Sequence, residues 1–218
     1  MKGPSSICLG GRFISWTPHP GGVMKRTIVL IDGGHLRALA TNAGQNYTPD
    51  FIERFATSVL ATDEEPLRVL YYDCAPYQGQ QPRPVSGDIQ TFNKSDGWLT
   101  DLAGRDLFAV RLGVLKWRGW KPRQVLAQGQ QISDADFKPD FEQKGVDLKI
   151  GLDIATYSLN RSVERIILVT GDTDLIPAMK LARRCGVQLV GIDLPNRRQS
   201  AELRSHVDLS RSVGWPGP

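Results

Sequence analysis

The sequence predicts a three-layer α/β/α fold, in which a mainly parallel β-sheet lies between two layers of helices. Strand and helix signals alternate from Arg26 to Leu194. The apolar runs Thr27–Ile31 and Arg165–Val169 are too short for surface helices and continuous enough for buried strands. Such alternation is typical of a parallel sheet covered by its crossover helices. Right-handed crossovers then bring the ends of these two strands to one edge of the sheet.

Two helices and a strand are expected after the first strand. Gly33-Gly34 predicts a tight turn, and apolar residues then recur at helical spacing at Leu36, Leu39, Ala40 and Ala43. Thr48-Pro49-Asp50 is typical of a helix start, because Thr can cap, Pro fits the first turn and Asp suits the positive helix end. The apolar face of this helix is expected at Phe51, Ile52, Phe55, Val59 and Leu60. Leu67–Tyr72 predicts the next strand, which ends at Asp73.

The middle of the chain is less regular. Residues 75–87 are rich in Pro, Gln and Gly and predict a loop. A weaker helix is expected next, with a buried side formed by Ile89, Phe92, Trp98, Leu99 and Leu102. Residues 108–115 predict a strand, and the polar residues 121–139 predict an irregular surface excursion.

The last third of the chain is expected to complete the sheet. A helix over residues 147–159 is expected to bury one stripe, formed by Leu148, Leu152, Ala155 and Leu159. Strands are predicted at 165–169 and 187–193, separated by a helix over 174–185 that Gly186 closes. Residues 196–218 predict a basic tail that is partly helical and docks through Leu203, Val207 and Val213.

Length and composition favour a single globular domain. The chain has 218 residues, of which 40% are hydrophobic and 23% charged. The net charge of +4 is mild, so nucleic-acid binding would need a local basic patch. The three cysteines are far apart and form no CxxC pair, which argues against a zinc knuckle or a disulfide framework and favours the cytoplasm. No segment reaches the ~18 apolar residues of a membrane span.

Residues 1–24 predict either a disordered leader or a mis-assigned start, with Met24 as the true first residue. The segment lacks acidic residues and periodicity up to Val23. Gly21-Gly22-Val23 is what a purine-rich bacterial ribosome-binding site would encode if it were translated in frame, and it therefore favours a bacterial source.

Four aspartates follow or interrupt the apolar segments at places where a site is expected. Asp32 ends the first strand, Asp172 and Asp174 follow the strand at 165–169, and Asp147 opens a helix. The carboxyl ends of parallel strands line the crevice where ligands bind. Crowded carboxylates repel one another unless a cation holds them, and oxygen ligands suit Mg²⁺ or Mn²⁺ and phosphate chemistry.

Simpler roles exist for some of these acids. Asp32 could merely cap the following helix, and Asp147 could be an ordinary first-turn residue. Thr170–Asp174 is more specific, because a cap needs only one of its two acids. Asp153 lies six positions after Asp147, over halfway around the helix, so both cannot face one ion equally.

Several motifs together resemble the NYN family, a branch of the PIN-like nucleases. They are Ile31–Leu36, Tyr71–Asp73, Arg111–Gly113, Gln143–Asp147 with Asp153, and Thr170–Asp174. The resemblance covers about Lys25 to Ser210 and implies a PIN-like nuclease domain over residues 25–195. It also implies a metal-dependent ribonuclease that hydrolyses RNA phosphodiester bonds and leaves a 5′-phosphate and a 3′-hydroxyl.

The resemblance also implies roles for individual residues. Asp32, Asp147, Asp172 and Asp174 would form the acidic pocket that holds Mg²⁺ or Mn²⁺, with Asp153, Thr170 and Thr173 beside them as supporting residues. The family usually has Asn where this chain has His35, which is expected to be a supporting residue too. This substitution leaves open a catalytically weak or inactive RNA-binding or adaptor module. An aspartate-based phosphatase is disfavoured, because its second acid would stand where Gly34 does.

A basic and aromatic stretch offers a candidate RNA-binding surface. Residues 105–123 carry six basic residues and one acid, with two tryptophans interleaved. Bases can stack on indoles while cations follow the phosphates. The expected RNA-binding residues are Lys116, Trp117, Arg118, Trp120, Lys121, Arg123 and Lys144. The alternative is an edge hairpin whose Lys and Arg discourage aggregation. RNA is the expected partner, and a homo-oligomer is left open.

Overall fold

The computed structural model describes residues 24–125, 131–195 and 197–217, and it has the predicted three-layer α/β/α architecture. Seven strands form the central sheet in the order β6-β5-β2-β1-β7-β8-β9, and a separate pair joins β3 to β4. All neighbours in the large sheet are parallel except β5 and β6. The strands are β1 (Lys25–Asp32), β2 (Glu64–Cys74), β3 (Gly79–Pro82), β4 (Ile89–Phe92), β5 (Phe108–Pro122), β6 (Phe137–Lys144), β7 (Arg165–Val169), β8 (Gln188–Asp193) and β9 (Leu209–Ser212).

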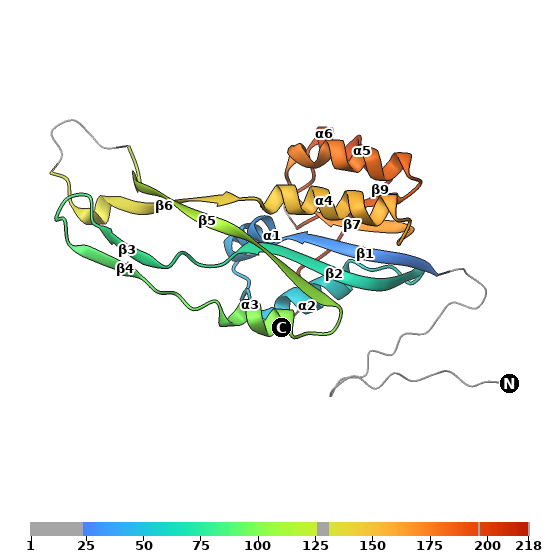
Figure 1. Cartoon of the computed structure of the whole chain (residues 1–218), viewed down its shortest axis with the longest axis horizontal. Helices are drawn as coiled ribbons and strands as arrows, with labels where there is room; N and C mark the ends of the chain where they lie inside the picture. Colours follow the sequence, from blue (N-terminus) through green and yellow to red (C-terminus); the bar gives the residue numbers. More distant parts are fainter. Residues whose placement is uncertain (1–23, 126–130, 196, 218) are drawn as a thin grey trace.

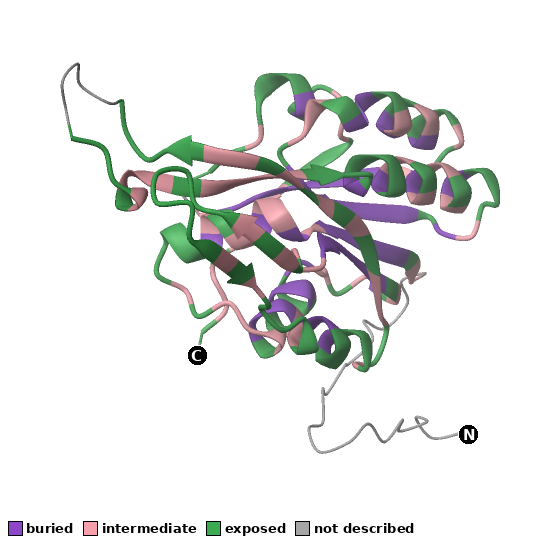
Figure 2. Ribbon diagram, turned by 60° about the vertical axis from the view of Figure 1, so that its left-hand side comes forward, coloured by how far each residue is buried: buried purple, intermediate pink, exposed green. Residues whose placement is uncertain are grey.

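Helices cover both faces of the sheet (Figure 1). They are α1 (Gly33–Asn42), α2 (Pro49–Ser58), α3 (Gly97–Ala103), α4 (Val146–Leu159), α5 (Ile176–Arg184) and α6 (Ala201–Arg204). Successive residues of β1 point to opposite faces, so Val29 packs with α1 and α2 while Leu30 packs with α4 and α5. The central strands are buried on both faces, as Figure 2 shows in purple. Two apolar cores therefore lie on either side of one sheet.

Local capping signals confirm two predicted helix boundaries. The Thr48 hydroxyl accepts a hydrogen bond from the Phe51 amide at 3.2 Å, and Pro49 occupies the first turn of α2. Gly186 adopts a left-handed φ of +83° just after α5, where most side chains would be strained. These ends depend on neighbouring residues alone, which is why the sequence predicts them.

The expected weaker helix over residues 89–102 is wrong in its first half. Residues Ile89–Phe92 form strand β4, which pairs antiparallel with β3. Strand β3 lies inside residues 75–87, where the sequence predicts a loop. Ile89 is exposed rather than buried. The helix itself is shorter, and it buries Leu99 and Leu102 as expected. Strand β4 forms because it pairs with β3, and the spacing of apolar residues within 89–102 carries no information about that partner.

The expected surface excursion over residues 121–139 is wrong at its two ends, where residues 121–122 and 137–139 belong to strands, and right for the described residues between them. Strand β5 continues to Pro122 and pairs antiparallel with β6, so that the two strands extend away from the body (Figure 1). We call residues 114–122 and 137–144, with the β3–β4 hairpin, the arm. Five aromatic side chains hold the arm together, namely Tyr77, Phe92, Trp117, Trp120 and Phe141. Contacts between these distant segments form the aromatic core of the arm. The local sequence, which is mostly polar, does not predict such a core.

Helix α4 buries a different stripe from the expected one. Leu148 and Leu152 are 66% and 56% exposed, and Leu159 also faces solvent. The buried residues are Val146, Ile150, Ile154 and Ser158. Both stripes have helical spacing, so periodicity cannot choose between them. The sheet packs against the stripe that contains the β-branched residues. This orientation of α4 about its axis places Gly151 against Ala178 of α5.

The C-terminal segment contributes a strand in addition to the expected docked helix. Leu203 of α6 is buried, as expected for a docked tail. Residues Leu209–Ser212 form β9 and pair in parallel with β8, which was not predicted. Arg204 forms an ion pair with Asp193 at 2.6 Å, so part of the basic charge of the tail is structural. Residues 1–23 of the expected leader lie outside the described residues.

A buried ion-pair network lies at the start of β2, at the end of the sheet opposite the predicted site. The fully buried carboxylate of Glu64 accepts hydrogen bonds from Arg165 at 2.5 Å and Arg211 at 2.9 Å. The Ala61 amide also donates to it, at 2.6 Å. Burial tends to raise the pKa of Glu64, but these hydrogen bonds outweigh it and hold the pKa below its ordinary value. Within the described residues, no helix is long and apolar enough to cross a membrane.

Candidate active site

Asp32 lies where β1 passes into α1. Its Oδ1 accepts a hydrogen bond from the His35 amide at 3.0 Å, so it does cap the helix. Its Oδ2 faces the hydroxyl of Thr170, 3.4 Å away at the end of the neighbouring strand β7. Burial raises the pKa of Asp32 above its ordinary value, although the His35 amide opposes the shift. Asp32 therefore caps α1 through one oxygen while the other faces the edge of the sheet.

The turn after β7 is organised by Thr170. This buried residue accepts a hydrogen bond from the Asp172 amide at 3.1 Å while its hydroxyl faces Asp32. Asp172 in turn accepts from the Asp174 amide at 2.9 Å, around the short 3₁₀ turn η2 (Thr173–Leu175). Thr173 stands between the two acids at the start of that turn. Thr170 thus links the ends of β1 and β7, which is the supporting position that we expected for it.

Asp147 reaches the same edge from α4. Gly145 precedes the helix with a left-handed φ of +79°, and Asp147 follows in the first turn. Its carboxyl lies close enough to that of Asp172 for the two to influence each other. Partial burial raises the pKa of Asp147, and the charges of Asp172, Asp32 and Asp174 raise it further. The structure therefore brings the four predicted acids into one electrostatic cluster, which we call the acidic cluster.

His35 packs over the turn that carries the acidic residues. A Cβ built on Gly171 would lie 2.7 Å from the His35 ring, so only glycine leaves room for the imidazole. Burial lowers the pKa of His35, an effect that Asp32 opposes and Arg197 reinforces. The imidazole therefore stands beside Asp32, and its role as a supporting residue stays a prediction.

The surroundings of Asp153 differ from those of the four acids in the acidic cluster. It accepts a hydrogen bond from the Tyr72 hydroxyl at 2.8 Å and lies 3.4 Å from Nε of Arg111. These contacts join α4 to β2 and β5. Asp153 thus holds in place the helix that carries Asp147, and its supporting role at the site stays a prediction.

Sequence reasoning missed a buried network next to Asp32. Asp73 is fully buried at the end of β2 and forms an ion pair with Arg37 of α1, whose side chain is 38% exposed. The Tyr71 hydroxyl donates to Asp73 at 3.1 Å and contacts the Tyr47 hydroxyl at 2.9 Å. Asp73 also raises the pKa of Asp32 through its charge. The signal was present, because Asp73 ends a strand just as Asp32 does.

Gly33 is required by this network. A Cβ at Gly33 would lie 2.4 Å from the Tyr71 hydroxyl and 2.7 Å from the Tyr72 carbonyl oxygen. We expect Gly33→Ala to lower the free energy of unfolding by about 1–3 kcal/mol, because the buried ring has nowhere to move. Urea unfolding would measure the change. Gly34→Ala is the matched control, since its Cβ meets the flexible end of Gln143. Equal stability of the two variants would contradict the steric argument.

The predicted RNA-binding residues lie along the arm and at its base. Three of the cations face acids across or along the strands, in the pairs Arg118–Glu142, Lys121–Asp140 and Lys144–Glu142. Lys116 stands opposite Glu142 in the ladder. Arg123 donates through Nε to the carbonyl oxygens of Ala135 and Phe137. Trp117 packs in the aromatic core of the arm, while Trp120 lies at its border.

The donor set of the acidic cluster consists of carboxylate oxygens. Within the described part of the chain, no three His, Cys, Asp or Glu side chains already form a group that could hold a metal ion. The charges with the strongest influence on Asp147 are nevertheless all negative. In chemistry and charge, the cluster fits a hard divalent cation.

The fold and its acidic edge are consistent with an α/β domain of the NYN or PIN-like kind. Residues 111–212 match the family model described as the NYN domain, which confirms the predicted resemblance over this part of the chain. The matched segment contains Asp147, Asp172 and Asp174, whereas Asp32 precedes it.

A solved structure has a similar fold. It is a protein of unknown function, VPA0982, from Vibrio parahaemolyticus RIMD 2210633, with a TM-score of 0.51 and 18% sequence identity. The similarity covers 89% of this chain and 96% of the other. At this identity the comparison supports the fold alone. No curated protein matches the chain.

Proposed function

We propose that the protein is a metal-dependent ribonuclease that hydrolyses RNA phosphodiester bonds at the acidic cluster. One observation carries the proposal: the Asp147 carboxyl lies where the negative charges of Asp172, Asp32 and Asp174 all act on it. A structural role would not require such repulsion, whereas a bound divalent cation would offset it. The match of residues 111–212 to the NYN domain supports a nuclease-like fold.

Asp32, Asp147, Asp172 and Asp174 would hold the ion, and their oxygen donors favour Mg²⁺ or Mn²⁺. Such ions, when bound, activate water and stabilise the oxygen that leaves the scissile phosphate. The protein contributes orientation. The His35 amide and the Thr170 hydroxyl fix Asp32, and the Asp174 amide fixes Asp172.

A cleavage assay tests this proposal. Labelled single-stranded and structured RNAs are incubated with the purified protein in Mg²⁺, in Mn²⁺ or in EDTA. We expect cleavage with at least one ion and none in EDTA, with 5′-phosphate and 3′-hydroxyl products. Cleavage that persists in EDTA, or that is equal in wild type and Asp172→Asn, would mean contamination or a different site.

A second candidate is an RNA-binding or adaptor module of the same fold without turnover. The observation that favours it is His35, which stands where the family usually has Asn and packs as a partly buried ring on Gly171. RNA that binds the protein but stays intact with both ions would select this candidate. Restored cleavage in His35→Asn would then identify the imidazole as the cause.

Ion binding should also be visible in thermal unfolding. An ion at about one hundred times its Kd adds about 2.7 kcal/mol of stability, so Mg²⁺ or Mn²⁺ should raise the Tm of the metal-free protein by about 5–10 °C. Asp147→Asn should lose most of this shift. Without metal the same variant should be more stable than wild type by about 0.2–0.5 kcal/mol, because a like-charge contact is removed.

Asp101→Asn is the matched control for this measurement, since Asp101 is an exposed acid on α3. It should keep the full ion-dependent shift. A shift of wild-type size in Asp147→Asn would show that the ions bind elsewhere.

A further inference from the structure

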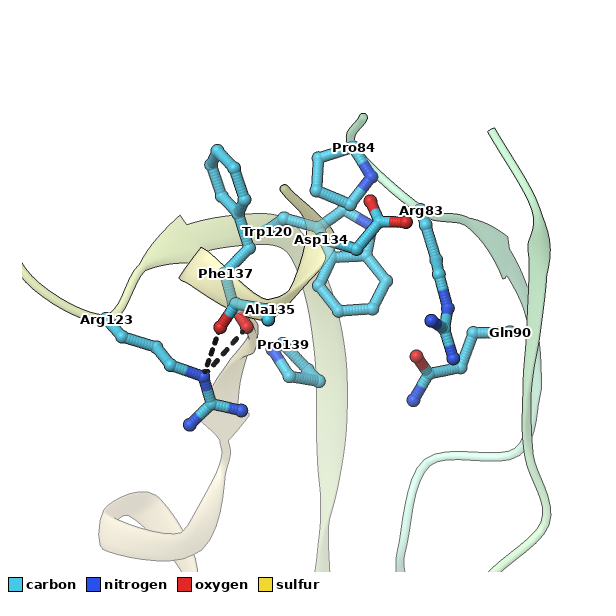
Figure 3. Close-up of a pocket in the computed structure, with 9 residues that line it drawn as sticks. All are labelled: Arg83, Pro84, Gln90, Trp120, Arg123, Asp134, Ala135, Phe137 and Pro139. Carbon is cyan, nitrogen blue, oxygen red and sulfur yellow. Dashed lines mark hydrogen bonds between the residues drawn. The ribbon is translucent and has the colours of Figure 1, made fainter. Parts of the chain in front are cut away.

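A recess of about 270 Å³ lies in the arm, between the β3–β4 hairpin, the end of β5 and the start of β6 (Figure 3). Its lining includes Arg83, Gln90, Trp120, Arg123 and Phe137. It is separate from the acidic cluster, since none of the four acids lines it. The volume is close to the lower end of ligand sites, about 300 Å³, and suits a single planar group.

Trp120 is fixed in position at this recess. Its Nε1 donates a hydrogen bond to the Pro82 carbonyl oxygen at 2.7 Å. Its ring meets Trp117 edge to face, with centroids 5.3 Å apart, and it also packs near Phe92. These contacts hold the indole through its edge and its inner side, and Figure 3 shows the ring in the recess beneath Pro84. A preorganised ring of this kind stacks a flat ligand at low entropic cost.

Two arginines supply positive charge around this ring. Arg123 is oriented by the hydrogen bonds of its Nε to the carbonyl oxygens of Ala135 and Phe137, both 3.1 Å long. The Arg83 guanidinium makes no hydrogen bond or ion pair to the described part of the chain, and it lies beside Gln90 in Figure 3. Asp134 also lines the recess, and its carboxylate accepts hydrogen bonds from the backbone amides of Val85 and Ser86. The charge of Arg83 also acts on Asp134, so the recess combines an aromatic ring, an amide, two cations and one acid.

We infer that this recess binds one unpaired nucleobase of single-stranded RNA, stacked on Trp120, with the adjoining phosphates on Arg83 and Arg123. Every base has a face that stacks on an indole, and cations that flank the ring neutralise the backbone. Gln90 offers donors and acceptors to the edge of the base. The inference rests on the proposed RNA function and adds a substrate class to it.

Strand β6 connects the recess to the acidic cluster. Phe137 at its start lines the recess, and Gln143 near its end lies against Gly34, two residues after Asp32. Seven steps of about 3.3 Å separate Phe137 from Lys144, a span of about 23 Å. An RNA strand of several nucleotides along β6 would therefore contact both places, whereas a dinucleotide at the cluster would not.

The test measures RNA affinity in EDTA, where the proposed hydrolysis cannot occur. A fluorescent single-stranded oligoribonucleotide long enough to span β6 is titrated with wild type, Arg83→Gln and Trp120→Leu. We expect each variant to bind roughly tenfold more weakly, because one stacked base or its phosphate contact is lost. Arg54→Gln is the charge-matched control, because Arg54 is an exposed residue of α2, and it should bind like wild type.

Two results would overturn the inference. One is unchanged affinity in Arg83→Gln, which alters no packing and so should leave the fold intact. The other is an equal loss for a duplex of the same sequence, since its paired bases cannot enter the recess. Cleavage by wild type in Mn²⁺ is scored separately. Cleavage with unchanged affinities rejects the recess alone, and weakened affinities without cleavage reject the hydrolytic function alone.

Discussion

Asp172→Asn should lose RNA cleavage by at least about 100-fold, because one carboxylate of the proposed ion site becomes a neutral amide. Among the acids, Asp172 has the largest electrostatic influence on Asp147, and loss of its charge weakens the attraction for a cation. The fold should persist, since Asn keeps the side-chain oxygen that accepts from the Asp174 amide. The amide nitrogen of Asn can even donate to Asp147, so thermal stability without metal should not fall. The loss of activity would therefore report chemistry rather than unfolding.

The measurement is the initial rate of cleavage of one RNA substrate at saturating Mg²⁺ or Mn²⁺. Asp101→Asn carries the same chemical change on the outer surface of α3 and should keep the wild-type rate. Higher ion concentrations should recover part of the Asp172→Asn rate if the defect is ion affinity. A rate within about threefold of wild type at every ion concentration would remove Asp172 from the proposed site. Mutation of residues that support a metal site typically costs roughly 10-fold or more in metal affinity or activity.

Glu64→Ala should lower the free energy of unfolding by about 3–5 kcal/mol at neutral pH, because it leaves a buried guanidinium without its partner. Arg165 is only 5% exposed, and Glu64 accepts one of its hydrogen bonds at 2.5 Å. Arg211 of β9 loses the same partner, so the last strand should loosen from the sheet first. Urea unfolding measures the total loss, and hydrogen exchange at β8 and β9 locates it.

Glu65→Ala is the matched control, since Glu65 is the exposed neighbour of Glu64 on the same strand. It should change stability by no more than about 0.5 kcal/mol. The pKa of Glu64 is lowered in the folded state from an ordinary value of 4.5. Its stabilisation is therefore complete above that value and is lost as the pH falls through the lower folded pKa. The difference between Glu64→Ala and wild type should shrink on acidification; a constant difference would contradict an electrostatic origin.

Local patterns were sufficient for the architecture and for the positions of the acids. The run before Asp32 and the run before Thr170 are buried strands because continuous apolar residues have no other place in a small domain. Parallel order then brings both strand ends to one edge, and the structure does place Asp32 near Asp147 and Asp172. The function of these acids as ligands stays a prediction, which the cleavage and thermal experiments address.

Contacts between distant segments decided the rest. The exposure of Leu148 and burial of Ile150 depend on which side of α4 the sheet accepts, and both stripes have the same spacing. Asp73 is marked in the sequence by its place at the end of a strand, but its pairing with Arg37 joins two elements and was decided by the fold.

By itself, the sequence determined the alternating strands and helices and their caps, because each depends on residues a few positions apart. The parallel order that such alternation implies then predicted the edge at which the acids gather. Only the tertiary structure decided the arm, the added strand β9 and the recess at Trp120. These features arise from pairing between segments far apart in the chain, and the free energy of such pairing is set by the partner surface rather than by the local pattern.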